Sequence, residues 1–116
     1  MSLPEPKPIA DFRAGSLRVL AYETRAWPDD FTGLDGSAGD LSVFVATGGA
    51  RWLVRLDRGA VAVDVDTAAQ AATQVSGDPS AVLRWLWGRA DDSAVRIDGD
   101  RAGAARLRAL MAEALQ

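Results

Sequence analysis

The sequence contains neither cysteine nor histidine in its 116 residues. The absence of cysteine excludes disulfides, thiolate catalysis and cysteine-rich zinc sites, and the absence of histidine removes the most common metal ligand and general base. Catalysis would have to rely on Asp, Glu, Arg, Ser or Tyr22, and the chain has no paired-carboxylate motif and no calcium-loop spacing. We therefore expect no catalytic residues, no metal and no cofactor.

Long apolar runs and basic clusters are absent as well. The sequence contains no run of about 18 apolar residues, which would predict a membrane span. Its first ten residues, MSLPEPKPIA, lack the charged and apolar regions of a signal peptide. The 13 basic and 16 acidic residues are spread along the chain, so that no basic footprint for a phosphate backbone exists. We expect a cytoplasmic protein with no nucleic-acid partner and no membrane insertion.

What the sequence does contain is ordinary globular composition, 48% hydrophobic and 25% charged, at a length that suits one domain. Three prolines remove backbone donors near the start and hold their neighbours extended: Pro4, Pro6 and Pro8. We therefore predict a flexible N-terminal tail over residues 1–9 and a single domain over residues 10–116.

The segment from Asp11 to Ala26 has apolar residues at helical spacing. This spacing predicts a first helix that ends before Pro28. A short strand over Leu17–Glu23 is the alternative. The Gly-, Asp- and Ser-rich segment that follows is typical of a surface loop.

Three strand patterns then follow, separated by short turns: Leu41–Thr47, Arg51–Asp57 and Ala60–Asp66. Apolar and polar residues alternate in the second and third, as a sheet with one solvated face requires. Trp52 lies on the apolar face of the second strand, and Arg51 and Arg55 lie on the other. These arginines are expected across from Asp64 and Asp66, where each pair would contribute about 0.2–1 kcal/mol.

The C-terminal half predicts strand, helix, strand and helix in that order. A fourth strand over Ala72–Gly77 leads to Asp78, a helix N-cap, and Pro79 at the first helical position. A fifth strand covers Ala94–Asp98, and Asp100 caps a final helix. The buried face of that helix comprises Ala104, Leu107, Leu110, Met111 and Ala114. This element order predicts an α+β domain with a mostly antiparallel sheet.

The helix that starts at Asp78 carries two tryptophans, Trp85 and Trp87. They point about 160° apart on a helix, which favours packing in the core against two different neighbours over stacking on a flat ligand. Gly88 is expected to end the helix with a positive φ. Arg89 either forms a salt bridge or helix-end cap, or binds an anionic group.

The stretches VSGDPSAVLRWLWGR, VRIDGD and RLRALM together resemble the C-terminal domain of the mycothiol-dependent maleylpyruvate isomerase family, over about residues 40–115. The matching residues are Val75, Gly77, Leu83, Leu86, Trp87, Gly88, Arg89, Val95, Gly99, Asp100 and Leu107. The resemblance implies a sterol-carrier-protein-2-like fold, a single five-stranded sheet with helices packed on one face. It also implies that Arg89 faces a shared active site, where it would bind an anionic ligand group.

In full-length members of that family an N-terminal helical bundle supplies histidine and glutamate metal ligands. This sequence has no histidine, so those ligands cannot be carried over, and we expect the domain to stand alone.

The sequence supports two functional hypotheses. The leading one is a non-catalytic module that binds an apolar, lipid-like small molecule in a groove between sheet and helices. Its candidate ligand contacts are Arg89, Trp85, Trp87, Trp52 and Phe44. The alternative is an accessory domain that docks on a metal-binding helical-bundle enzyme, or forms a homodimer, through an apolar patch.

Overall fold

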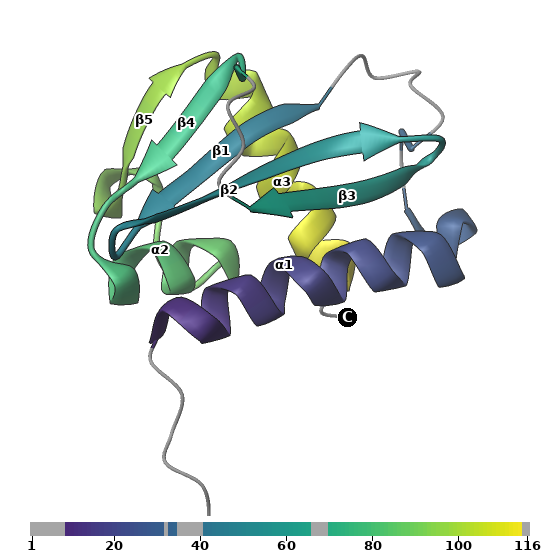
Figure 1. Ribbon diagram of the computed structural model, residues 1–116, viewed down its shortest axis with the longest axis horizontal. Helices are drawn as coiled ribbons and strands as arrows, with labels where there is room; N and C mark the ends of the chain where they lie inside the picture. The colour runs from purple at the N-terminus through teal and green to yellow at the C-terminus, as the bar shows by residue number, and fades with distance from the viewer. Residues whose placement is uncertain (1–8, 32, 35–40, 66–69, 115–116) are drawn as a thin grey trace, which may run out of the picture.

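The computed structural model describes residues 9–31, 33–34, 41–65 and 70–114, with side chains from residue 15 onward (Figure 1). The helices are α1 (Ile9–Ala26), α2 (Pro79–Leu86) and α3 (Arg101–Ala114), with short 3-10 turns η1 (Pro28–Asp30) and η2 (Asp92–Ala94). The strands are β1 (Ser42–Thr47), β2 (Ala50–Asp57), β3 (Ala60–Val65), β4 (Thr73–Ser76) and β5 (Arg96–Gly99). The α+β class is confirmed. Apart from Ile9, which begins α1, the predicted tail lies outside the described residues.

One five-stranded sheet has the order β3-β2-β1-β4-β5. All neighbouring strands are antiparallel except β1 and β4, which are parallel. The two hairpins turn at Gly48-Gly49 and Arg58-Gly59, and all four of these residues have positive φ. Such two-residue turns match the twist of the flanking strands, so the predicted meander of the first three strands is confirmed.

The three helices cover one face of the sheet (Figure 1). Alternate residues of the strands supply the apolar surface beneath them, among them Val43, Val45, Trp52, Val54, Val61 and Val75. The helices contribute Leu17, Leu20, Val82, Trp85, Leu86, Leu107, Leu110 and Met111. The predicted buried face of the last helix is confirmed at its first four positions, and Ala114 is half-buried.

The first element is a helix, and the strand alternative is wrong. It is anchored by Thr24, which is fully buried. The Thr24 hydroxyl donates to the Ala21 carbonyl at 3.0 Å and accepts the Val61 N–H at 2.9 Å. Because β3 is an edge strand, the Val61 N–H has no strand partner on that side, and the helix supplies one.

The expected helix caps differ from each other. The Asp100 carboxylate accepts the Ala102 N–H at 2.9 Å, as expected of a cap for α3. The Asp78 side chain makes no cap hydrogen bond, and only its backbone carbonyl serves α2, through the Val82 N–H at 2.9 Å. The fifth strand begins at Arg96, two residues later than predicted, because η2 occupies the preceding residues.

The solvated side of the sheet carries the predicted cross-strand charge pair. Arg55 Nε lies 2.6 Å from Asp64 Oδ2, and this hydrogen bond raises the pKa of Arg55. Arg51 instead lies over the Phe44 ring, 4.0 Å from its centroid. Its expected partner, Asp66, lies outside the described residues. In the described part of the chain no helix is both long and apolar enough to cross a bilayer.

We predict that Gly99→Ala destabilises the protein far more than Gly49→Ala. Both glycines have positive φ, +92° and +79°, which costs an L-residue about 1–2 kcal/mol. A Cβ at Gly49 meets no atom within 4 Å, whereas one at Gly99 overlaps the Ala72 carbonyl oxygen, which accepts the Asp100 N–H. Urea unfolding of both variants measures the difference, and equal losses would contradict the expected backbone clash.

Candidate functional site

The helix with the two tryptophans ends in a Schellman motif, which determines where its last side chains point. Gly88 has φ +73°, and its N–H donates to the Trp85 carbonyl at 3.1 Å. The Arg89 N–H donates to the Arg84 carbonyl at 2.7 Å. This pair of bonds satisfies the last carbonyls of α2. The predicted role of Gly88 is confirmed, and the helix ends before Arg89.

Trp85 fills the space between the sheet and the helices. Its exposed fraction is 0%, and its indole N–H donates to Asp92 Oδ1 at 2.8 Å. Arg108 of α3 lies against the same ring, 5.5 Å from the centroid, with Nη1 3.5 Å from Asp92 Oδ1. Arg108 Nη2 also donates to the Ala90 carbonyl at 2.9 Å. These contacts join α2, the loop after it and α3 into one unit.

A second carboxylate shapes the same loop. The Asp91 side chain accepts hydrogen bonds from the backbone N–H and the hydroxyl of Ser93. Both bonds favour the charged form, which lowers the pKa of Asp91. Asp91 is exposed, so we interpret it as a turn residue.

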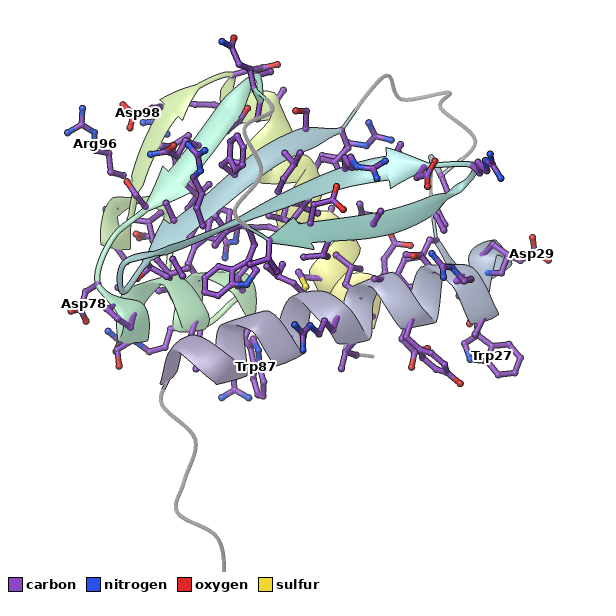
Figure 2. The ribbon with its side chains drawn as sticks, in the orientation of Figure 1. Trp27, Asp29, Asp78, Trp87, Arg96 and Asp98 are labelled. Carbon is purple, nitrogen blue, oxygen red and sulfur yellow. The ribbon has the colours of Figure 1, made fainter. Side chains whose placement is uncertain are left out.

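Trp87 differs from its neighbour. It is 47% exposed, and its indole N–H donates to the Ser16 hydroxyl of α1 at 2.9 Å (Figure 2). The expectation that both tryptophans pack in the core is therefore wrong for Trp87. The two side chains point in opposite directions as expected, but only one direction leads into the interior.

Arg89 is exposed, and among the described residues its side chain has no ion pair and no hydrogen bond. The expected structural salt bridge is therefore not formed there. Because α2 stops at Leu86, Arg89 does not continue the face shared by Val82, Trp85 and Leu86.

The remaining candidates lie in two separate layers. Trp52 is buried in the main core, under the helices. Phe44 is 4% exposed but lies on the opposite face of the sheet, because strand neighbours alternate and Val43 and Val45 face the helices. The five residues predicted as ligand contacts thus do not come together around one space.

The groove was expected between the sheet and the helices, and where the sheet meets α2 the described side chains leave no opening. Val43, Val45, Val54 and Val75 each have 0% exposure, as does Trp85. Side chains that have no surface accessible to water do not line an open channel. In this structure the interface of sheet and α2 is therefore packed solid.

Two open hollows lie instead along α1 and the sheet edge. One, of about 370 Å³, is lined by Arg18, Ala21, Tyr22, Arg25, Val61, Ala62 and Val63. The other, of about 380 Å³, is lined by Thr24, Arg25, Pro28, Asp57, Arg58, Gly59 and Ala60. We call the first the α1–β3 hollow and the second the turn hollow. Arg25 borders both, so they adjoin, and each has the volume of a small-molecule pocket.

The residues of the α1–β3 hollow were missed by sequence reasoning. The available signal was the spacing of Arg18, Tyr22 and Arg25, which places an arginine one turn before and one turn after a tyrosine on the same side of a helix. Tyr22 is 66% exposed. The spacing alone could not reveal that the edge of the sheet runs alongside.

The sequence matches the family model described as the MDMPI C-terminal domain over residues 8–106. The chain belongs to this family. No curated protein matches it. The family resemblance expected from the Trp-Gly-Arg and Gly-Asp stretches is thereby confirmed, and so is the sterol-carrier-protein-2-like fold that it implied.

Three solved structures show this fold. The ubiquinone synthesis protein UbiJ-SCP2 superposes with a TM-score of 0.61 at 15% identity, covering 98% of this chain and 97% of that chain. The sterol carrier protein domain 2 of Helicoverpa armigera gives a TM-score of 0.60 at 14% identity, covering 98% and 94%. The inverting sec-alkylsulfatase Pisa1 from Pseudomonas sp. gives 0.55 at 15% identity, covering 71% of this chain.

This MDMPI C-terminal domain spans 14% of the length of the sulfatase chain, whereas it covers nearly the whole of the two sterol-carrier-like domains. The two sterol-carrier-like chains are therefore matched along nearly their whole length, and the sulfatase chain along a small part.

We predict that Asp92→Ala lowers the free energy of unfolding by about 1–3 kcal/mol, because the buried Trp85 indole N–H loses its acceptor. Asp92→Asn keeps an acceptor oxygen and is expected to cost less. Urea unfolding followed by tryptophan fluorescence compares the two. If the Asn variant lost as much stability as the Ala variant, the charge opposite Arg108 would be responsible instead of the indole bond.

Proposed function

We propose that this domain is a non-catalytic binding module for an apolar small molecule, which it holds in the α1–β3 hollow. The observation that supports this most is the floor of the hollow. Ala21 and Val63, both partly exposed, form an apolar surface beside the ring of Tyr22, and Val61 lies fully buried beneath it. An apolar floor with a few polar groups at its rim is the usual character of a small-molecule site.

The names of the solved neighbours support the same class of ligand. One is a sterol carrier protein domain, one a ubiquinone synthesis protein and one an alkylsulfatase. Sterols, ubiquinone and alkyl groups are all apolar. Fold likeness by itself is a weak guide to function, so the proposal depends on the hollow and takes the neighbours only as support.

The hollow lies between α1 and the edge strand of the sheet, and not under α2. A ligand placed there contacts the edge of the sheet, without displacing the tightly packed side chains around Trp85. Opening that interior would sacrifice close-packed contacts, at a cost similar to that of a core cavity. Binding at the margin avoids this cost.

We predict that the protein binds dodecanol saturably, with shifts in ¹H–¹⁵N spectra concentrated in α1 and β3. Ala21→Trp is expected to weaken binding at least about tenfold, because the indole occupies the apolar floor. Ala105→Trp is the matched control, since Ala105 is exposed on α3. If Ala21→Trp and Ala105→Trp bound dodecanol with the same affinity, the proposed location of the site would be contradicted. No saturable shift in any variant would contradict the function.

The docking alternative stays a prediction. Four large apolar side chains are exposed on or beside α1, namely Val19, Tyr22, Trp27 and Trp87. Figure 2 shows Trp27 and Trp87 along this helix. Such exposure favours contact with another protein. Self-association through α1 predicts a sedimentation coefficient that rises with concentration in the unmodified chain and not in Val19→Asp. A sedimentation coefficient that does not change with concentration would contradict self-association.

A further inference from the structure

The two adjoining hollows have a cationic rim. Arg18 and Arg25 come from α1, and Arg58 comes from the β2–β3 turn. The α1–β3 hollow has two arginines in its lining and no acidic residue. The turn hollow includes Asp57, whose carboxylate already lies 3.9 Å from Arg55 Nη1.

Most of the other arginines whose side chains are described have partners, and Arg84 and Arg89 are the exceptions. Arg55 and Arg96 form ion pairs with Asp64 and Asp98 at 2.6 and 3.0 Å, and Arg108 with Asp92 at 3.5 Å. Within the described ranges, the side chains of Arg18, Arg25 and Arg58 have no ion pair and no hydrogen bond. The protein as a whole carries a net charge of -3, so the local positive charge of these three arginines is opposite in sign to the net charge.

The position of Arg58 adds to the argument. Arg58 has φ +54°, the one non-glycine residue with positive φ in the described part of the chain. The first central position of such a turn favours Asn, Asp or Gly, and an arginine there costs about 1 kcal/mol or more. A guanidinium is thus placed beside the hollows at a position whose backbone favours other residues.

The edge strand provides a further donor. In an antiparallel strand the N–H groups of alternate residues point to the same side. Val61 directs its N–H away from β2, to the Thr24 hydroxyl. Val63, two residues further along β3, therefore directs its N–H to the same outer side, where its side chain lines the α1–β3 hollow. The hollow thus combines an apolar floor, two guanidinium groups and a backbone amide.

We infer that the ligand of the α1–β3 hollow is an anionic amphiphile, with an apolar chain on the floor and a carboxylate, sulfate or phosphate head between Arg18 and Arg25. These arginines lie two turns apart, about 10.5 Å along the helix axis, on either side of Tyr22. Guanidinium groups bind such oxyanions through paired, charge-assisted hydrogen bonds. The inference rests on the proposed function, and adds to it the chemical class of the head group.

The test uses four ligands with the same twelve-carbon chain at concentrations below micelle formation: dodecanol, dodecanoate, dodecyl sulfate and dodecyltrimethylammonium. We expect the two anions to bind at least about tenfold more tightly than dodecanol, and the cation more weakly. Raising the ionic strength from about 0.05 to 0.5 M should weaken the anions and leave dodecanol unchanged, because only the charged contacts are screened.

Variants locate the head group. Arg18→Gln and Arg25→Gln are each expected to weaken dodecyl sulfate binding about five- to tenfold, with dodecanol binding unchanged. Arg84→Gln is the matched control, because Arg84 is exposed on α2 and has no side-chain partner among the described residues. The dispersion of the ¹H–¹⁵N spectrum verifies that each variant stays folded.

The outcomes separate the two proposals. Binding of all four ligands with equal affinity would overturn the anionic head group and leave the apolar site in place. If Arg84→Gln weakened anion binding as much as Arg18→Gln and Arg25→Gln do, the anionic head group at this hollow would be overturned too. The effect would then come from the overall charge of the protein and not from a site. Binding of none of the four would overturn the proposed function itself.

Discussion

The structure depends on the burial of one indole. Trp85 occupies the centre of the interface between α2, α3 and the sheet with no exposed surface, and its N–H is satisfied by Asp92. A buried polar group of this kind is tolerated only when it is paired. The pairing fixes the loop after α2, and Arg108 then ties that loop to α3. Among the described residues, the side chains packed around Trp85 leave no open channel between the sheet and α2.

The elements that the sequence predicted well are those whose signals are local. Alternation and two-residue turns defined the first three strands to within one residue of their observed ends, because strand pattern and turn type act over a few residues. Gly88 was assigned correctly for the same reason, since a helix end with positive φ is a local event. The fold class and family followed from these elements and from the stretch around Trp87.

What the sequence could not supply was the position of one element against another. Arg89 was expected to form a salt bridge or helix-end cap, or to bind an anion. Because the Schellman motif stops α2 at Leu86, the Arg89 side chain is exposed and has no partner among the described residues. Trp87 lies next to α1 through Ser16, a contact across 71 positions that no local pattern records. The α1–β3 hollow depends on β3 being the edge strand beside α1, which the strand order alone determines.

The attachment of α1 explains why a site can form at this margin. An edge strand exposes N–H and C=O groups that natural proteins cover or protect. Here Thr24 covers one of them at Val61, whereas the stretch of β3 around Val63 borders a hollow. The helix α1 therefore covers the strand edge at Val61 and leaves a hollow beside it at Val63, two residues further on. Under the proposed function, a ligand would contact the strand at Val63, two residues beyond the position where Thr24 attaches α1, so that binding would not break this attachment.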